Sequence, residues 1–411
     1  MLKSIIRKEI LSNILSYKFS IIIILSTILI LVSIFVMYHD YCLALDNYEI
    51  LRQESEGAIM VIRPTPLSIF AKGLDENLCR SYQGGSSARI GVSSKQQSMN
   101  DIFKLFTAPD LLYVVKVILS LCAMLFAFDI ICGEKETGTL RQSLSCSLKR
   151  PILIFGKWIG GFTSFILPFF IAVLLGTIFV TLSSMVEMSA RNWAKLGLFL
   201  LSSVVYLAVF FSLGLLISCL THHSSSSLVF SLFVWAIFVF LIPNLGNILA
   251  SQLVRIPTVK RLEFRLEQSS IRRDFEKHRA DKSQHDRIDK RIRAEDEKLL
   301  DDYRNRLNRL VKVSRNITRM SPLAAFTFLA TDAMGTGVAE ERRLKRAVLQ
   351  HRDILRAWDD EKGDRPAFSY QRSTVKEILD QRGLSNCLIL ILFNILFFTG
   401  AYVVFLRYDV R

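Results

Sequence analysis

The sequence predicts an all-α integral membrane protein with six transmembrane helices and an N-terminal amphipathic elbow helix. Of the 411 residues, 51% are hydrophobic and 29 are Phe, and the mean hydropathy is +0.34. Six apolar stretches are each long enough to cross a hydrocarbon core of ~30 Å, which takes about 20 helical residues. These stretches are continuous rather than alternating, and lipid offers no hydrogen-bond partner to a bare backbone. They are therefore expected to be helices.

The first 18 residues predict an interfacial helix that lies along the membrane. This stretch is too polar for a cleavable signal, and no small-residue cleavage site follows the first apolar run. Its apolar residues recur at helical spacing, while the basic residues between them suit lipid headgroups. The apolar set is Ile5, Ile6, Ile10, Leu11, Ile14 and Leu15, and the basic set is Lys3, Arg7, Lys8 and Lys18.

The six predicted spans follow in chain order. They are residues 19–38, 111–132, 158–182, 195–219, 226–246 and 385–406. The second span contains Lys116 and Asp129, each close enough to an end for its side chain to reach the interface. Pro168 in the third span and Pro243 in the fifth each remove a backbone donor, and we expect both to kink their helices.

The distribution of Lys and Arg orients the spans. The N-terminal segment and the link 133–157 are both rich in Lys and Arg, whereas the link 183–194 offers only Arg191. Positive loops stay in the cytoplasm. With six crossings, both termini are then cytoplasmic, and the protein is expected in the cytoplasmic (inner) membrane of the cell.

Two long polar segments are then extracytoplasmic, residues 39–110 and residues 247–384. In the second, residues 255–319 hold 20 Lys/Arg and 12 Asp/Glu, and apolar residues recur at heptad-like spacing, which predicts helices. The apolar-poor stretch 276–287 is either the turn of an antiparallel hairpin or the middle of one long helix; the hairpin is favoured. The heptad-spaced residues are Phe264, Ile271, Phe275, Ile288, Ile292, Leu299, Tyr303 and Leu310.

Two more helices are expected before the last span. Ser321 and Pro322 predict a helix start, and Gly335 with Gly337 a stop. This run is too short to span the membrane, so we expect it at the outer membrane surface or under the extracytoplasmic domain. A charged helix at about 338–362 follows.

Cysteine usage argues against a metal or redox centre, since none of the seven Cys forms a CxxC pair. Cys122, Cys132, Cys219 and Cys387 lie in or beside apolar runs and are interpreted as small core residues. Cys42 and Cys79 fall in the extracytoplasmic segment, where a disulfide persists. They are either bridged or two unpaired thiols.

Several function classes are excluded or disfavoured. The chain has no Walker A sequence GxxxxGK[ST], no HExxH and no GxSxG, so we expect no catalysis and no cofactor in this chain. His222 and His223 stand beside a serine run and indicate a polar turn rather than a metal site. The net charge is +15, but the basic residues border apolar runs or lie in the charged insert. No nucleic acid partner is therefore expected.

The informative stretch is the cytoplasmic link 133–157. Gly138 is expected to break the chain after the second span, and Thr139 to cap a short helix with an apolar face of Leu140, Leu144 and Leu148. Such a helix can dock into a groove of a cytoplasmic partner. The alternative is a positive loop that only fixes topology.

This stretch resembles the signature of ABC-2 type permeases, E-x-E-x-G-T-L, then an Arg, then Gly-Lys at the start of helix three. The matching residues are Glu134, Glu136, Gly138, Thr139, Leu140, Arg150, Gly156 and Lys157. The opening KEILSNILSYKFS resembles the elbow helix of that family. A later segment is similar to the SP-x-A-A…GTG segment of a branch with a large insert between helices five and six, which includes nitrous oxide reductase maturation and gliding-motility permeases. The residues of that match are Ser321, Pro322, Ala324, Ala325, Gly335, Thr336 and Gly337.

The resemblance implies a permease that works with a second permease protomer, identical or related, and with separate ABC ATPase subunits that bind ATP and Mg. Coupling to the ATPase is then expected at Glu134, Glu136, Gly138, Thr139, Leu140 and Arg150, whose alternative role is topology and helix capping. Export is the direction expected from the family. The basic extracytoplasmic domain makes an extracytoplasmic protein or an anionic polymer a plausible contact. The alternative function is a membrane-anchored scaffold or receptor with no transport, for which the helical domain is the working part.

Overall fold

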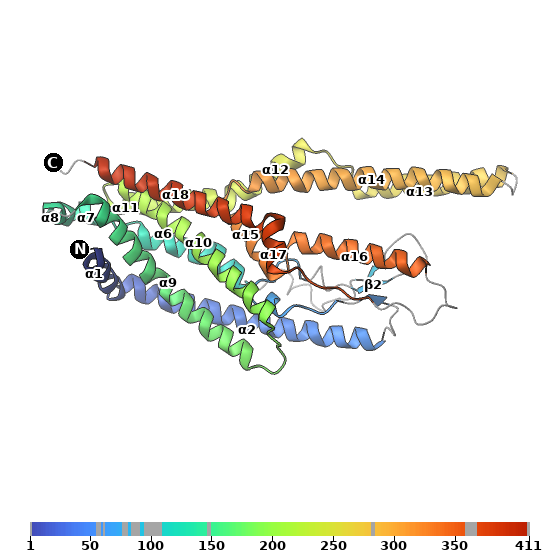
Figure 1. Ribbon diagram of the computed structural model, residues 1–411. Helices are drawn as coiled ribbons and strands as arrows, with labels where there is room; N and C mark the ends of the chain where they lie inside the picture. The colour runs from blue at the N-terminus through green and yellow to red at the C-terminus, as the bar shows by residue number, and fades with distance from the viewer. Residues whose placement is uncertain are drawn as a thin grey trace. The chain divides into compact units, whose positions relative to one another are not determined.

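The computed structural model describes residues 2–54, 59–60, 62–75, 81–83, 91–93, 109–145, 149–280, 284–357 and 368–408. The chain divides into two compact units (Figure 1). The first unit is Met1–Ala236 with Pro322–Arg411, and the second is Ile237–Ser321.

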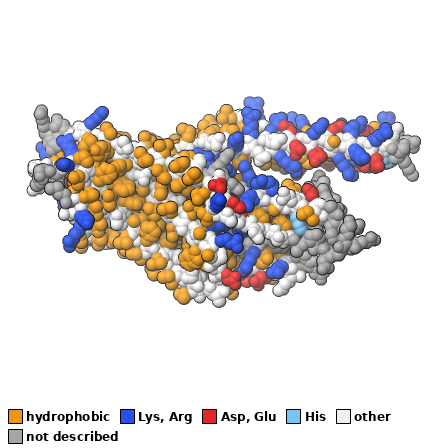
Figure 2. Space-filling model, in the orientation of Figure 1, with side chains coloured by type: hydrophobic (Ala, Val, Ile, Leu, Met, Phe, Trp, Pro, Cys, Tyr) orange, Lys and Arg blue, Asp and Glu red, His pale blue; other side chains and the backbone are white. Residues whose placement is uncertain are grey.

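Six helices in the described part of the chain are long and apolar enough to cross a membrane. They are Tyr17–Gln53, Leu111–Glu136, Arg150–Leu182, Ala190–Leu220, Ser224–Leu253 and Leu384–Arg407. The all-α membrane fold is thus confirmed. Apolar side chains such as Phe170, Leu174 and Leu392 are exposed on these helices, and orange side chains dominate the face of the first unit seen in Figure 2. An apolar exterior of this kind suits lipid rather than water.

The helices extend beyond the apolar runs that predicted them. The helix α2, Tyr17–Glu54, continues well past residue 38 into the predicted extracytoplasmic segment. The third, α9 (Arg150–Leu182), begins before residue 158, at the Arg150–Pro151 pair. A polar residue ends an apolar run but not a ladder of backbone hydrogen bonds, so the membrane span and the helix have different ends.

The helix α10, Ala190–Leu220, is the central element of the first unit. It packs against α6 (Ser120–Ala127), α11 (Ser224–Ala236), α15 (Pro322–Met334) and α18 (Leu384–Arg407). A polar chain joins α9, α10 and α18, because Trp158 Nε1 donates to Ser212 Oγ (2.9 Å) and Ser212 Oγ donates to Asn394 Oδ1 (2.8 Å). Such hydrogen bonds hold helices together in an apolar setting.

The predicted elbow helix is α1, Leu2–Ile14, and it lies against α9. Two glycines of α9 allow this close approach. A Cβ at Gly156 would lie 2.6 Å from Ile5 Cγ2, and one at Gly160 would lie 2.8 Å from Glu9 Cβ. Small residues let helix backbones approach within membranes, so Gly156 and Gly160 serve the α1–α9 interface.

The short helix predicted after Ser321 is confirmed as α15, which begins at Pro322 and is followed by Gly335 at φ +70°. Its expected place, at the outer membrane surface or under the extracytoplasmic domain, stays a prediction. Most of α15 is buried against α10 and α18, and Phe326 stacks on Tyr206 with ring centroids 4.4 Å apart. Its small and aromatic residues let a helix too short to span the membrane fit inside the bundle.

The remaining elements of the first unit are short. Between α2 and α5 (Leu111–Tyr113), the 3-10 helix η1, Pro66–Ile69, is buried, and β1 (Ile59–Met60), β2 (Ser81–Gln83) and β3 (Gly91–Ser93) form an antiparallel sheet in the order β1-β2-β3. A π-helical turn, η2 (Val114–Leu119), lies between α5 and α6. The charged helix predicted at about 338–362 is α16, Val338–Ala357; residues 358–362 lie outside the described ranges. The helix α17, Val375–Ile378, and the π-turn η6, Leu379–Gly383, lead into α18.

The second unit contains the predicted hairpin. It consists of the π-turn η3 (Ile237–Leu241), α12 (Ile242–Leu253), α13 (Val259–Arg279) and α14 (His285–Thr318). Pairs across the hairpin include Ser269 Oγ to Asp296 (2.6 Å) and Lys277 to Asp289 (2.8 Å). The antiparallel hairpin is therefore confirmed over the single long helix.

The remaining sequence predictions concern Pro and Cys. The helix α9 runs unbroken through the buried Pro168, so a kink there stays a prediction, whereas Pro243 follows the π-turn η3, a known source of helix irregularity. Cys42 is half-buried on α2, and Cys79 lies outside the described residues, so the bridge also stays a prediction. Cys122, Cys132 and Cys219 are buried.

Candidate functional site

The candidate site is the connection between α6 and α9. It comprises α7 (Cys132–Glu136), the linking residues Thr137 and Gly138, and α8 (Thr139–Ser145). Gly138 has φ +75°, a conformation that suits glycine and ends α7. The helix α1 and the end of α18 lie near α7 and α8 at one end of the first unit (Figure 1).

A buried lysine links this connection to the elbow helix. Lys157 on α9 is only 3% exposed, and its Nζ lies 2.7 Å from Glu134 Oε1 on α7 and 3.0 Å from Glu9 Oε1 on α1. A buried ammonium requires partners of opposite charge, and these two carboxylates supply them. Glu9, Lys157 and Glu134, called here the buried triad, thus join three helices.

The next two residues bind helix ends. Glu136 accepts hydrogen bonds from the backbone N (3.0 Å) and Oγ (2.7 Å) of Ser224, the first residue of α11. Lys135 Nζ donates to the carbonyl oxygens of Cys219 (2.5 Å) and Thr221 (3.0 Å) where α10 ends. An acid at a helix N-terminus and a base at a C-terminus each satisfy groups that the helix leaves unpaired.

Two further contacts complete the set of helix-end contacts. Arg150 Nη1 donates to the carbonyl oxygens of Leu406 (2.7 Å) and Tyr408 (3.1 Å), where α18 ends. Ser218 Oγ on α10 accepts from the backbone N–H groups of Ile131 and Cys132, at 3.0 Å each, where α7 begins. The connection between α6 and α9 is therefore tied to α1, α10, α11 and α18.

The apolar face of α8 points inward. Leu140 is 1% exposed and packs in a cluster with Ile5, Leu153 and Phe405, and Leu144 lies against the same cluster. Leu140 thus anchors α8 within its own chain, and its expected contact with a partner stays a prediction. Leu148 lies outside the described residues.

The outward face of the connection is polar. Thr139 is the first residue of α8, and its hydroxyl lies 3.0 Å from the hydroxyl of Thr137 rather than capping the helix. The exposed residues are Glu136, Thr137, Gly138, Thr139, Arg141, Gln142 and Ser145. A partner that binds at this end of the unit would contact hydrogen-bonding and charged groups, beneath which lies the apolar face of α8.

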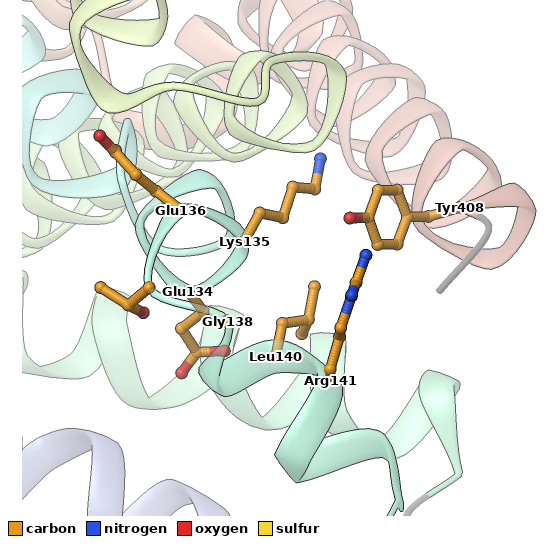
Figure 3. Close-up of a pocket in the computed structure, with 8 residues that line it drawn as sticks. Glu134, Lys135, Glu136, Gly138, Leu140, Arg141 and Tyr408 are labelled. Atoms are coloured by element: carbon orange, nitrogen blue, oxygen red, sulfur yellow. The ribbon is translucent and has the colours of Figure 1, made fainter. Parts of the chain in front are cut away.

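A shallow pocket of about 280 Å³ opens on this face (Figure 3). Its lining combines the EKETG stretch, Leu140 and Arg141 with Tyr408, which comes from the end of α18. Lys135 Nζ lies 4.7 Å from the centre of the Tyr408 ring, a cation–π distance. In Figure 3, Arg141 extends toward Tyr408 while Glu134 points away from it.

Charged and backbone hydrogen bonds, which are short and directional, join this connection to its neighbours. Glu134, Lys135 and Glu136 bond to α9, α10 and α11, and Arg150 bonds to the end of α18, whereas α8 itself is held by the packing of Leu140. No group of three His, Cys, Asp or Glu side chains suited to a metal ion occurs in the described part of the chain.

The sequence pointed to this segment but not to its partners. Glu134, Glu136, Gly138, Thr139, Leu140 and Arg150 lie together within it or at its end, while Glu9, Ser218 and Ser224 were missed. Those three residues are far from the segment in sequence, and single Ser or Glu residues carry no pattern. The helical spacing of α1 offered one signal, since Glu9 shares a face with Ile5 and Ile6.

The SP…GTG segment has a structural role at the other end of the first unit. Thr336 Oγ1 donates to the carbonyl of Ala71 (3.0 Å), and the backbone N of Leu74 donates to the carbonyl of Thr336 (2.8 Å). Arg372 Nη1 donates to the carbonyl of Gly335 (2.7 Å). The turn after α15 therefore fastens the segment 62–75 and the segment before α17 to the bundle.

A second buried polar cluster adjoins this turn. Glu340 is 2% exposed and accepts hydrogen bonds from Tyr370 Oη (2.8 Å) and the backbone N of Ser373 (3.2 Å). Burial, and then the neighbouring Glu340 carboxylate, raise the pKa of Tyr370. The phenol therefore remains a donor throughout the physiological range.

Comparison with known proteins yields two matches. The family described as ABC-2 family transporter protein matches residues 4–410. A curated relative, "Probable ABC transporter permease protein NosY" of Stutzerimonas stutzeri, is 30% identical over 136 residues, which are 32% of this chain and 48% of the relative. The match thus spans about half the length of that relative.

Proposed function

The chain belongs to the ABC-2 family of transporter proteins, and from that premise we propose that it is the permease subunit of an ATP-driven ABC transporter that exports its substrate. In this proposal the protein lies in the cytoplasmic membrane with both termini in the cytoplasm. It pairs with a second permease protomer, and separate ATPase subunits bind ATP and Mg. Export is taken from the family resemblance.

The observation that carries the proposal is the placement of α7 and α8. A loop that only fixes topology needs no more than positive charge. This segment is instead bonded to Lys157 of α9 through Glu134 and to the ends of α10 and α11 through Lys135 and Glu136, and Arg150, which follows it at the start of α9, bonds to the end of α18. The inward face of the segment is apolar and its outward face polar. Such a segment is built to receive a partner and to move with the bundle.

The proposed mechanism follows from these contacts. The ATPase binds the outward face of α8, and closure of the ATPases on ATP displaces that helix. Leu140 and the buried triad oblige α1 and α9 to follow, while Lys135 and Arg150 carry the ends of α10 and α18. The nucleotide then biases two arrangements of the helices, provided that the ATPase contacts α8 differently in each.

The experiment measures ATPase activity and complex formation with the candidate ATPase. The test variant is Arg141→Glu with Gln142→Glu, two exposed positions of α8. These changes spare the buried Leu140, whose loss would unfold the segment rather than test its surface. The matched control is Arg346→Glu on α16, an exposed arginine at the other end of the first unit (Figure 1).

We expect the native pair to form a complex with ATPase activity that responds to the permease. The α8 variant should lose that response while keeping its thermal stability, and the control should behave as the native protein. If no ATPase associates with the native protein under any nucleotide condition, the permease proposal fails and the scaffold or receptor function takes its place.

A further inference from the structure

The helix α13 of the hairpin carries large apolar side chains on a face that does not pack against α14. Phe264, Ile271 and Phe275 of α13 are 58%, 64% and 60% exposed. Their heptad-like spacing predicted helices, and the residues of α13 that bond to α14 are others, including Ser269 and Lys277. Successive residues of an α-helix are about 100° apart, so the three exposed residues form one narrow stripe, opposite the face that contacts α14.

This stripe of exposed apolar residues differs from the surface of an ordinary solvated helix. Scattered apolar residues on a surface are ordinary, but a line of large side chains along one face marks an interaction site. From Phe264 to Phe275 it covers about 16 Å of helix. The hairpin itself extends about 40 Å beyond the end of α12, because Thr318 of α14 lies beside Gly246 of α12 and α14 begins at His285.

Basic residues flank the stripe. Arg279 lies over the Phe275 ring, with its guanidinium 5.1 Å from the ring centre, which holds a positive charge beside the apolar surface. Lys and Arg are also prominent on the hairpin face seen in Figure 2. Within about 60° of the stripe on the helix the exposed polar residues are Lys260, Arg261, Glu267, Gln268, His278 and Arg279.

This charge pattern decides against a second copy of the hairpin as the occupant. A parallel pair of stripes would bring Lys260 and Arg261 against the same two residues of the other copy, and His278 and Arg279 against theirs. An antiparallel pair would bring Lys260 and Arg261 against His278 and Arg279. Like charges set opposite each other weaken an interface, whereas complementary charges steer a partner to it.

We propose that the outer face of α13 is a docking surface for an acidic amphipathic helix of a separate extracytoplasmic protein. The apolar face of that helix packs on Phe264, Ile271 and Phe275. Its acidic flanks meet Arg261 and Arg279 on one side of the stripe and Lys260 on the other. Helices pair in this way through residues spaced by three, four and seven. The inference rests on the proposed topology, which places the hairpin outside the cytoplasm.

The test uses the full-length protein in lipid nanodiscs and a labelled synthetic helix of about 20 residues. The probe has Leu at the spacing of the stripe and Glu on both flanks, and its binding is followed by fluorescence anisotropy. One control peptide replaces Leu by Ser, and another replaces Glu by Lys. The stripe variant is Phe264→Ser, Ile271→Ser and Phe275→Ser together, matched by Val259→Ser, which is 57% exposed on α13 but lies off the stripe.

We expect saturable binding of the acidic probe, weakened at least about tenfold by the stripe variant and by Arg261→Glu with Arg279→Glu. The variants Val259→Ser and Arg309→Glu, the latter at an exposed position of α14, should bind as the native protein does. The stripe variants should also keep ATPase stimulation, so failure here is separable from failure of the permease proposal.

Three results would overturn the proposal. The first is no saturable binding, or equal binding of the Lys-flanked peptide. The second is a stripe-dependent change in oligomeric mass, which would assign the face to another copy of this chain. The third is probe binding that follows the anionic lipid content of the nanodiscs and not the stripe.

Discussion

Removal of the charge of Lys157 should destabilise the protein more than any other single change at the candidate site. The variant is Lys157→Met, which keeps an unbranched side chain of similar length. It leaves Glu9 and Glu134 facing each other across the vacated ammonium position, and both carboxylates are largely shielded from solvent, at 14% and 22% exposure.

The magnitude follows from the two contacts. At 2.7 Å and 3.0 Å, each attraction is about 6 kcal/mol in gross terms for an effective dielectric constant of about 20. Desolvation of the three charges offsets much of this, and breaking a buried pair typically costs about 3–5 kcal/mol. We therefore expect a loss of about 3–5 kcal/mol of stability, with α1 released from α9.

The assay is thermal unfolding of the purified protein in one detergent. Lys157→Met should lower the Tm clearly, and adding Glu9→Gln with Glu134→Gln should restore part of it, because the stranded charges are then gone. Lys149→Met, at an exposed lysine just before α9, is the matched control. An unchanged Tm in Lys157→Met, or no recovery in the triple variant, would refute the electrostatic account of the triad.

Three further predictions concern Gly138, Arg150 and Glu377. Gly138→Ala should lower the free energy of unfolding by about 1–2 kcal/mol because the φ of Gly138 is +75°, although the added Cβ would meet no steric clash. Gly138→Asn should lower it less, and a comparison of the two Tm values tests this. Arg150→Gln should lose about 1.5–3 kcal/mol of stability through its bonds to the α18 carbonyls, and faster proteolysis near Tyr408 would report the freed helix end. Arg343 holds the pKa of Glu377 below its ordinary value of 4.5 by a hydrogen bond, so this pair stabilises the fold above that pH, and the stability is lost as pH falls through the lower folded pKa. In Arg343→Ala the fall in Tm between about pH 5 and pH 3 should be shallower, and an identical pH profile would contradict the assignment.

The main helices were predictable because the cause of each is local. A run of about 20 apolar residues has few options in a bilayer, and Pro322 and Gly335 punctuate α15 as they would in any helix. The hairpin turn was also predictable from the sequence, since residues 276–287 are rich in charge and contain almost no apolar residues.

The features that could not be predicted depended on neighbours far along the chain. The burial of α15 depends on its packing against α10 and α18, which no local pattern encodes. The heptad-like spacing of Phe264, Ile271 and Phe275 signalled an apolar helical face correctly, but not which helix face α14 covers. Likewise, Leu140 was rightly found apolar, yet its direction depends on Ile5, Leu153 and Phe405.

The sequence by itself determined the membrane class, the spans and the identity of the connecting segment, because hydropathy, helix breakers and a local motif are written in consecutive residues. Only the tertiary structure decided that Lys157 bridges Glu9 and Glu134, and that Lys135, Glu136 and Arg150 hold three other helix ends. Those contacts join residues from 23 to 258 positions apart. Their geometry is fixed by helix packing. Glycines of α9 allow the close approach of α1, and a buried charge requires partners of opposite charge.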